Sequence, residues 1–491
     1  MSSLGTRCVL DIKMQEEIEL TEDILALEEF PQENRKLVDE LWRRELSGQH
    51  QKILVLDDDP TGVQTVHDVS VYTDWSVESI RSGFLEKERL FFILTNSRSF
   101  TAEQTRQVHG EIAKRAAEVS RELGMDYLII SRSDSTLRGH YPLETQVLRE
   151  ITQKQLGVEI DGEILCPYFK EGGRFTIGDV HYVKIGNRLV PACETEFAGD
   201  RTFGYKAKNL REYIEEKTAG AFSSRDVVSI SLEELRRLDF DGIENKLMKV
   251  RDFRKVVVNA VSDEDLKVFV IALYRAMKHG KHFILRTAAS MVKIMGGVSD
   301  MPLLTKEQLS AKTGKNGGII IIGSHTDKTT EQMNALRDIP EIRFVEINTD
   351  LVLRENALEE EIRQLVKQCD GWISEGRTVA AYTKRRLLEV DGDTKEAALV
   401  RSVRISEAVQ SLVGNLHTKP AFVVAKGGIT SSDVGTKALK VKRARVLGQI
   451  CPGIPVWDTG EESRFPGILY VIFPGNVGEK DTLRQAAEKL L

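Results

Sequence analysis

The sequence has few cysteines, no membrane-length apolar run and no strong charge of either sign. Its five cysteines, at positions 8, 166, 193, 369 and 451 of 491 residues, show neither CxxC nor zinc-ligand spacing. Scattered cysteines of this kind are typical of reduced thiols and do not indicate a disulfide framework. No apolar run approaches the ~20 residues of a membrane helix, and the N-terminus lacks a signal-peptide core. We therefore expect a soluble cytoplasmic protein without a membrane partner.

The net charge is only -6, from 69 basic and 75 acidic residues spread along the chain. This balance gives no support to a nucleic-acid partner or to binding at an anionic membrane surface. With 41% hydrophobic residues, the chain is long enough for two or three domains with cores of their own.

The pattern of apolar residues predicts two α/β domains with largely parallel sheets, preceded by a helical extension. Residues 1–48 are acidic and have the apolar spacing of amphipathic helices, which suits packing or a homodimer contact. Between 49 and 300, apolar segments alternate with helical patterns as in βαβ units: KILVLD, RLFFILTN, YLIISRSD, KVVVNA and HFILRT. Residues 301–318 hold a proline and a glycine pair and form the predicted linker. The alternation returns over 319–491, in GIIIIG, IRFVEIN, TVAAYT, AFVVAK and LYVIFP.

Three consecutive aspartates follow the first of these apolar segments. In KILVLDDDPTG the run from 53 to 56 has no polar residue, which is typical of a strand covered on both faces of a parallel sheet. Such sheets bind ligands at the carboxyl ends of their strands. We therefore expect Asp57, Asp58, Asp59 and Thr61 to lie at a ligand site, although acidic loop residues often only face water.

Two further strand ends carry polar side chains that suit a small polyhydroxylated anion. Arginine can hold a carboxylate with two parallel hydrogen bonds, and hydroxyl groups can match those of a sugar. The alternative is that the arginines pair with carboxylates of the protein itself. The candidate ligand residues in the two segments LTNSRSF and ISRSDSTLRGH are Asn96, Arg98, Ser133, Asp134, Ser135 and Arg138.

In the second predicted domain, a strand runs three times into a loop of small residues and then a helix. The segments are IIIIGSHTDKTTEQMNAL, FVVAKGGITSSDVGTKAL and LYVIFPGNVGEKDTLRQAA. Glycines let backbone N–H groups approach a phosphate, and a helix N-terminus adds partial positive charge. Lys426 beside Gly427 and Gly428 strengthens the middle loop. Three such loops favour a polyphosphate ligand over plain helix capping, although neither GxxxxGK[ST] nor GxGxxG is present.

Six motifs in order make the sequence similar to the four-carbon acid sugar kinases. They are DDDPTGVQ, SRSDSTLRG, RTAAS, GSHTDKTTEQ, KGGITSSDV and FPGNVG. The resemblance covers residue 50 to the end. It implies an N-terminal domain that binds a sugar acid such as threonate, erythronate or an oxo-tetronate, and a C-terminal domain that binds ATP. It also implies substrate contacts around Asp57 to Asp59 and Ser133 to Arg138. The implied ATP contacts are Ser324, Gly427, Gly428, Ile429, Thr430 and Gly475.

The chain departs from the family pattern at three places. The acidic extension is unusual, the last loop has PGNVG where a Ser-Gly-Gly-Phe-Gly-like loop is expected, and Phe175 stands where a threonine is common. The first departure bears on assembly, and the others on the substrate and on ATP binding.

The expected reaction transfers the γ-phosphoryl group of ATP, bound with Mg²⁺, to a hydroxyl of the sugar acid. One carboxylate should accept the hydroxyl proton, and Asp57 and Asp134 are the favoured candidates, unranked. The metal ligands cannot be assigned from the sequence.

Two alternatives to a kinase stay open. Asp57 and Asp59 also satisfy DxDxT, the first motif of haloacid-dehalogenase-like phosphatases, with a nucleophile and an acid/base. That hypothesis lacks a lysine followed by a paired acidic motif, and it leaves the second domain unexplained. The other alternative is a sensor that binds nucleotide and sugar acid without turnover.

Overall fold

The chain folds into two compact units, each assembled from several segments of the sequence. The computed structural model describes residues 18–19, 30–386, 388, 390, 392–475 and 477–491. Unit 1 comprises the chain up to Gly48 with Asp134–Pro142 and Ile160–Met291, and unit 2 comprises Gln49–Ser133, Leu143–Glu159 and Val292–Leu491. The boundaries predicted from the sequence, at 48, 300 and 318, stay predictions. The α/β class with largely parallel strands is confirmed.

Unit 1 contains four parallel strands and a separate four-stranded antiparallel sheet. The parallel strands have the order β10-β11-β6-β12, and the antiparallel sheet has the order β1-β9-β8-β7. The strands are β1 (Ile18–Glu19), β6 (Gly162–Cys166), β7 (Arg174–Ile177), β8 (Val180–Ile185), β9 (Arg188–Pro191), β10 (Val228–Ile230), β11 (Arg254–Val258) and β12 (Phe283–Thr287). The helices of this unit are α2 (Gln32–Ser47), α6 (Leu210–Lys217), α7 (Leu232–Arg236), α8 (Phe240–Met248) and α9 (Asp263–Lys278).

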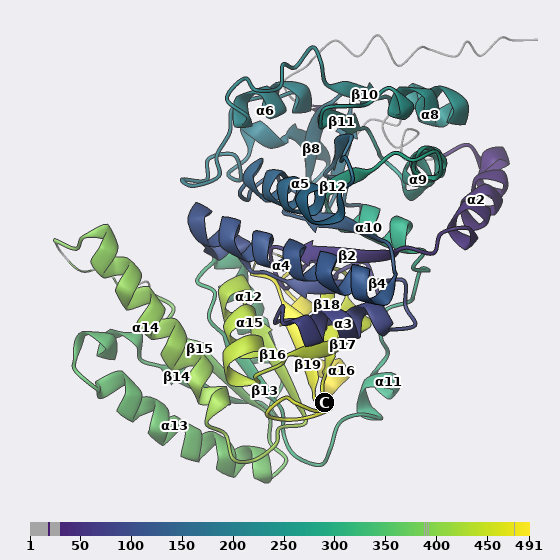
Figure 1. Cartoon of the computed structure of the whole chain (residues 1–491). Helices are drawn as coiled ribbons and strands as arrows, with labels where there is room; N and C mark the ends of the chain where they lie inside the picture. Colours follow the sequence, from purple (N-terminus) through teal and green to yellow (C-terminus); the bar gives the residue numbers. More distant parts are fainter. Residues whose placement is uncertain (1–17, 20–29, 387, 389, 391, 476) are drawn as a thin grey trace, which may run out of the picture. The chain divides into compact units, whose positions relative to one another are not determined.

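The predicted N-terminal helix is present as α2, which packs against α9 in unit 1 (Figure 1). Trp42 is buried in this contact, and two ion pairs border it: Lys267 with Asp39 at 2.6 Å and Arg275 with Glu45 at 3.4 Å. Of the acidic segment before α2, residues 1–17 and 20–29 lie outside the described residues. The helix is therefore fixed to its own chain by apolar burial with charges at the rim.

The strands of unit 2 are neighbours in the order β5-β2-β4-β3-β17-β18-β19-β16-β13-β15-β14. Strands β17 and β18 run antiparallel to their neighbours, and the rest of the neighbouring pairs are parallel. The strands are β2 (Lys52–Asp57), β3 (Ser70–Tyr72), β4 (Leu90–Leu94), β5 (Tyr127–Arg132), β13 (Ile319–Ile322), β14 (Arg343–Ile347), β15 (Val379–Thr383), β16 (Phe422–Lys426), β17 (Arg443–Cys451), β18 (Ile454–Thr459) and β19 (Leu469–Phe473).

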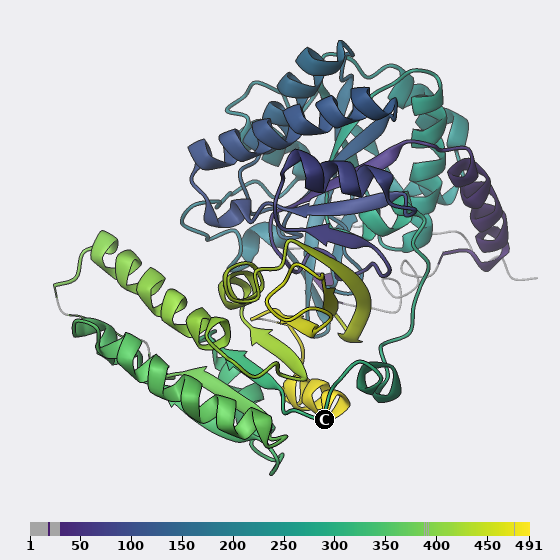
Figure 2. The ribbon, with the colours of Figure 1, turned by 60° about the horizontal axis from the view of Figure 1, so that its bottom comes forward.

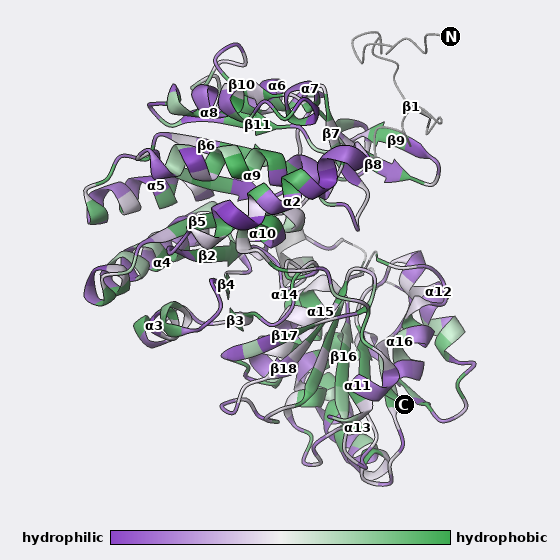
Figure 3. Ribbon diagram, turned by 90° about the vertical axis from the view of Figure 1, so that its right-hand side faces the viewer, coloured by the Kyte–Doolittle hydropathy of each residue, from purple (hydrophilic) through white to green (hydrophobic). Residues whose placement is uncertain are grey.

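Helices cover these strands because each has an apolar stripe to bury. Figure 3 shows the strands around β16 in hydrophobic colours, whereas α16 carries both hydrophobic and hydrophilic residues. The long helices α13 and α14 lie side by side (Figure 2). The helices of unit 2 are α3 (Val77–Leu85), α4 (Ala102–Leu123), α5 (Leu143–Leu156), α11 (Lys306–Ser310), α12 (Asp327–Leu336), α13 (Ala357–Ser374), α14 (Lys395–Gly414), α15 (Gly428–Asp433) and α16 (Thr482–Leu490), and α10 (Ala289–Gly296) crosses the boundary between the units.

All ten apolar segments predicted as strands are strands in the structure. Among the described residues, no helix combines the length and the apolar character that a membrane crossing requires. The parallel arrangement matters for function because it brings the carboxyl ends of neighbouring strands to one edge of the sheet.

One buried ion pair in unit 1 offers a test of how the sheet is held together. Glu163 on β6 and Lys255 on β11 are register partners, both fully buried, with 2.8 Å between Oε2 and Nζ. Replacing Lys255 by methionine leaves a buried carboxylate without its ammonium partner. We expect Lys255→Met to lower the free energy of unfolding by ~3–5 kcal/mol, measured by urea denaturation.

The double variant Lys255→Met/Glu163→Leu is the matched control, since it removes both charges. It should recover much of the lost stability, because a buried ion pair is often no better than apolar residues of similar volume. If the double variant is as unstable as the single one, the loss comes from packing and the charge argument is wrong.

Candidate functional site

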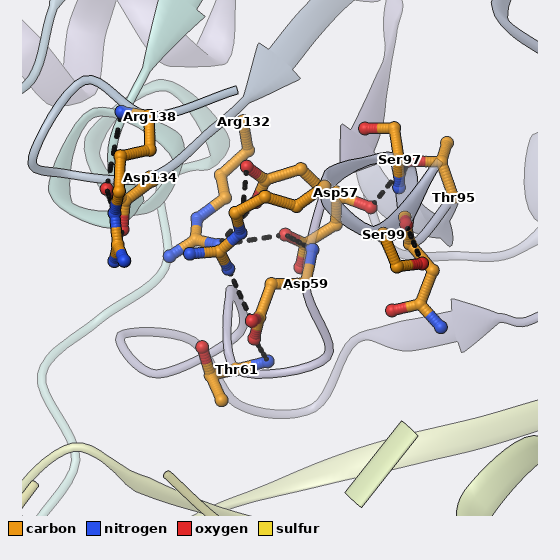
Figure 4. Close-up of polar contacts among 12 residues, drawn as sticks. Asp57, Asp59, Thr61, Thr95, Ser97, Ser99, Arg132, Asp134 and Arg138 are labelled. Carbon is orange, nitrogen blue, oxygen red and sulfur yellow. Dashed lines mark hydrogen bonds and ion pairs between the residues drawn. The ribbon is translucent and has the colours of Figure 1, made fainter. Parts of the chain in front are cut away.

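The aspartates predicted as ligand residues lie at the carboxyl end of β2, where Arg132 and Arg98 from neighbouring strand ends form ion pairs with them. Figure 4 shows Arg132 beside Asp57. Asp57 and Arg132 are register partners on the parallel strands β2 and β5. Nη1 of Arg132 lies 3.0 Å from Oδ1 of Asp57 and 3.3 Å from Oδ1 of Asp58. All three side chains are buried. The parallel sheet thus brings a cation from one strand end against two anions from the next.

Asp59 is more accessible than the other two aspartates. Its side chain is 19% exposed, whereas those of Asp57 and Asp58 are at most 2% exposed. Arg98, which follows β4, forms an ion pair with Asp59 and lies 3.6 Å from Oδ2 of Asp58. The backbone N–H of Thr61 donates to Oδ1 of Asp59 at 2.8 Å, which closes the turn after the strand.

A close approach explains the glycine after this turn. A Cβ on Gly62 would lie 2.0 Å from the carboxylate of Asp57, so only glycine lets the loop fold back over that side chain. On the other side, the N–H and the hydroxyl of Thr95 both donate to the Asp57 carbonyl, at 2.8 and 2.9 Å. The next residue, Asn96, has a positive φ of 58° and donates through its amide to Ser432. The loops after β2 and β4 are therefore fixed to each other.

Burial and ion pairing give the three aspartates different pKa values. Burial raises the pKa of Asp57 to about 7 and that of Asp58 to about 6, against the opposing effects of Arg132 and Arg98. Burial acts in the same direction on Asp59, but Arg98 and the hydrogen bonds from Thr61 outweigh it, and the pKa of Asp59 is lowered. At neutral pH Asp59 is the carboxylate most firmly ionised.

The predicted residues of the ISRSDSTLRGH segment lie partly in each unit. Ser133 is in unit 2, next to Arg132, and its hydroxyl is buried without a hydrogen-bond partner among the described residues. Asp134, Ser135 and Arg138 are in unit 1. Arg138 donates to Asp134 through Nε at 2.9 Å and Nη2 at 3.2 Å (Figure 4). This is the local pairing with a protein carboxylate that the sequence left open as an alternative.

Four side chains that the sequence did not predict as contacts hold this loop by its carbonyl oxygens. His181 donates to Ser135, Tyr205 to Thr136 and Tyr213 to Leu137, at 2.7, 3.1 and 3.0 Å, and Arg286 to Arg138 at 3.4 Å. Burial lowers the pKa of His181 to about 4, so the ring is neutral. The motif RTAAS contains Arg286, but no sequence signal marks the two tyrosines.

The three small-residue loops of the second predicted domain converge in unit 2. Gly427 has φ +124°, and a Cβ there would lie 3.2 Å from the Cβ of Ser324 and 3.2 Å from Oγ1 of Thr430. A Cβ on Gly475 would lie 3.1 Å from Oγ of Ser324. The loops follow β13, β16 and β19, whose parallel pairing brings their ends together. We call Ser324, Lys426–Thr430 and Gly475 the three-loop cluster.

Lys426 ties the loops of this cluster together. Its Nζ is buried and donates to the carbonyls of Pro474 at 2.7 Å and Gly475 at 3.3 Å, beside the ring of Phe473. Thr326 and Thr329, at the start of α12, also donate to the carbonyl of Gly475, at 3.3 and 3.2 Å. The backbone of the last loop is thus held against the other two.

A cavity of about 490 Å³ opens beside the three-loop cluster. Its lining is mixed, with the exposed apolar side chain of Ile429 and polar groups such as His325, Thr383 and Thr430. That volume suits a small organic ligand. Residues from several loops and helices line it, among them Gly323, His325, Thr383, Ile405, Ile429 and Thr430. Within the described part of the chain, no group of three or more His, Cys, Asp or Glu side chains is arranged to hold a metal ion.

Two known domain families match this chain. A family model for a sugar-binding N-terminal domain matches residues 53–295, and one for a nucleotide-binding C-terminal domain matches residues 319–483. The chain is thus a two-domain protein of the sugar- and nucleotide-binding class. It belongs to the four-carbon acid sugar kinase family, to which its six sequence motifs are similar.

Two solved structures share the fold. Haemophilus influenzae protein HI1011 is 18% identical, with a TM-score of 0.59 and an alignment that covers 89% of this chain and all of that one. A Salmonella typhimurium LT2 protein, described provisionally as a tRNA synthase, is 15% identical, with a TM-score of 0.64 and coverage of 90% and 100%. At these identities the likeness shows the fold alone. No curated protein matches the sequence significantly.

The raised pKa of Asp57 predicts how stability changes with pH. Its folded-state pKa of about 7 lies above the ordinary value of 3.8, so the folded state holds the proton more tightly than the unfolded state. The stability that Asp57 contributes when protonated is therefore lost as pH rises from about 4 to 7. Asp57→Asn is neutral throughout. We expect its stability relative to the wild type to rise with pH in this window, by up to ~1.4 kcal/mol per pH unit.

Urea denaturation of both proteins at pH 5, 6 and 7.5 measures this difference. Two stability curves that stay parallel across the window would show that Asp57 does not change its proton affinity on folding.

Proposed function

We propose that the protein is an ATP-dependent kinase that phosphorylates a hydroxyl of a small, four-carbon sugar acid. The observation that carries the proposal is the pairing of a matched sugar-binding region with a matched nucleotide-binding region in which three loops converge beside a cavity. A protein that binds both ligands can bring the phosphoryl donor and the acceptor hydroxyl together, which is most of what phosphoryl transfer requires. The charge balance and the cysteine pattern further support a cytoplasmic location without a nucleic-acid partner.

The three-loop cluster fits the phosphates of ATP, and the cavity beside it fits the nucleoside. Side chains at Gly427 and Gly475 would fill the space between the loops, so the glycines keep backbone groups accessible. Ser324 and Thr430 add hydroxyl donors, and Ile429 offers an apolar surface to a purine ring. A Mg²⁺ ion bound with ATP would neutralise phosphate charge. The described residues offer no three-ligand protein site for it, which fits an ion held mainly by phosphates and water.

The sugar acid is assigned to the strand-end cluster of β2, β4 and β5. Arg98 and Asn96 can donate to a carboxylate or hydroxyl, and Asp58, Asp59 and Thr61 can accept from hydroxyls. Arg98 is the cation least enclosed in this cluster, with 20% of its side chain exposed against 5% for Arg132. Ser133, Ser135 and Arg138 stay predicted substrate contacts, carried by the motif SRSDSTLRG.

Among the candidate carboxylates, we favour Asp59 as the acceptor of the hydroxyl proton. All three candidates pair with an arginine, but Asp57 is enclosed beside Arg132 and Asp134 gives both of its oxygens to Arg138, whereas Asp59 keeps 19% of its side chain exposed beside Arg98. Asp59 keeps an exposed edge, and a Cβ on Gly428 of the three-loop cluster would lie 3.8 Å from its Oδ2. Its lowered pKa keeps it ionised and able to accept a hydrogen bond from the acceptor hydroxyl.

The phosphatase alternative is less well supported by the geometry. Its nucleophile would be Asp57, whose carboxylate is buried under Gly62 and paired with Arg132. A nucleophile has to reach the phosphorus atom, and this one is enclosed. The other alternative is a sensor that binds both ligands without turnover. The observations that support it are the same ones that support the kinase, so none favours the sensor.

Turnover with a panel of four-carbon sugar acids tests the proposed function. We expect ATP consumption that depends on one of the acids, with a phosphorylated acid detected by mass spectrometry. Phosphate release from phosphorylated acids in the absence of ATP would support the phosphatase instead. Binding of both ligands in calorimetry, without product, would leave only the sensor.

Asp59→Asn tests the assignment of the proton acceptor. The amide keeps the size of the side chain but cannot accept a proton, so kcat should fall by ~10²- to 10⁴-fold with little change in ATP affinity. Asp68→Asn is the matched control, because Asp68 is an exposed aspartate of the same unit whose ion pairs, among the described residues, are with His67 and Arg445 at the surface. Turnover of Asp59→Asn close to that of Asp68→Asn would exclude Asp59 from this role.

A further inference from the structure

The phosphates of a nucleotide need positive charge, but the ammonium group of Lys426 is already used within the fold. Its Nζ is buried, and its hydrogen bonds go to the carbonyls of Pro474 and Gly475. Burial lowers the pKa of Lys426 to about 7, so part of the population carries no charge at neutral pH. The cation that the sequence put beside the phosphate loops therefore has a structural task, which leaves a place for a second cation at the phosphates.

Arg385 follows β15, the strand next to β13 in the sheet. Its Nη2 and Nε donate to Oγ1 of Thr330 on α12, at 2.9 and 3.3 Å. Its Nη1 is buried and has no hydrogen-bond partner among the described residues, and no described carboxylate forms an ion pair with it. The guanidinium is thus held in place by a neutral hydroxyl, with one donor nitrogen left over.

This arginine lies at the edge of the sheet that carries the three-loop cluster. Ile322 at the end of β13 and Tyr382 near the end of β15 are register partners, so the loops that follow both strands start side by side. The first loop contains Ser324 and leads into α12, the helix that anchors Arg385. Thr383 and His325, from the same two loops, line the cavity.

A half-buried cation is disfavoured when no carboxylate lies beside it. Burial lowers the pKa of Arg385, and no carboxylate of the described residues opposes that effect. The pKa of His325 is lowered by burial and, to a smaller extent, by Arg385. A buried charge normally has a partner, because its desolvation is costly. Elsewhere in unit 2 the half-buried or buried arginines Arg98 and Arg132 face aspartates. An anionic ligand would complete the same pairing at Arg385.

We propose that Arg385 binds the phosphate chain of the nucleotide, with Thr330 orienting its guanidinium. This inference rests on the proposed function, since it assigns a residue to the same nucleotide site. Arginine suits the task because Nη1 and the second N–H of Nη2 can give two parallel hydrogen bonds to phosphate oxygens while Nε and the first N–H of Nη2 stay on Thr330. The ligand class is a nucleoside di- or triphosphate.

Calorimetry of the full chain with ATP, ADP and adenosine tests the proposal. For Arg385→Gln we expect the affinity for ATP and ADP to fall about 10- to 100-fold, as for the loss of a charge-assisted hydrogen bond, with adenosine binding unchanged. Arg385→Lys, which keeps the charge and loses the fork, should fall in between. Arg386→Gln is the matched control, because it removes the same charge from the next, exposed residue and should bind like the wild type.

Thr330→Val separates phosphate binding from a merely structural role. It removes the anchor and keeps the cation, so it should cost less ATP affinity than Arg385→Gln while both melt at similar temperatures. If Thr330→Val and Arg385→Gln lose the same ATP affinity, or if Arg385→Gln binds ATP like the wild type, the assignment of Arg385 is wrong. Either result would leave the proposed function untouched. A wild-type protein that binds no ATP would overturn the proposed function itself.

Discussion

The compensation of buried charge is the constraint on which both candidate ligand sites depend. Neighbouring parallel strands lie ~4.8 Å apart, so register partners of opposite charge can meet within the sheet. Asp57 and Arg132 meet in this way in unit 2, and Glu163 and Lys255 in unit 1. Two further aspartates, Asp58 and Asp59, follow Asp57 at the end of its strand. Arg98, from the loop after β4, forms ion pairs with both of them. The position of each arginine therefore decides which carboxylate stays accessible.

The strands could be predicted from the sequence because their signal is local. Runs such as Ile319–Ile322 and Leu90–Leu94 are apolar throughout and fully buried, as expected for parallel strands covered on both faces. Strand β17, RARVLGQIC, was not predicted. It alternates between buried and less buried residues, and it pairs with β18 and with β3, which is far away in the sequence. Long-range pairing of a half-exposed strand leaves no short apolar run to find.

The clustering of candidate residues was also predictable, but their partners were not. Parallel strands bring their carboxyl ends together whatever the side chains are, so Asp57, Asn96 and Arg132 had to lie near one edge. Which oxygen each guanidinium takes depends on loop conformation. Arg138 takes both oxygens of Asp134 four residues earlier, and Lys426 turns to carbonyls instead of solvent. Sequence patterns give the kind of residue at a strand end but not the direction of its side chain.

The loop after β5 and the loop after β19 are held in the same way, through donors that bind their backbone carbonyl oxygens. This arrangement bears on how the two loops could bind an anion. A carbonyl oxygen near an anion repels it, whereas N–H and hydroxyl groups attract it. In unit 1 the carbonyls of Ser135, Thr136 and Leu137 are taken by His181, Tyr205 and Tyr213. In unit 2 the carbonyl of Gly475 is taken by Lys426, Thr326 and Thr329. Donors within the fold thus hold the carbonyl oxygens of both loops, which fixes the direction of those oxygens and lowers the conformational cost that an anionic ligand would have to meet.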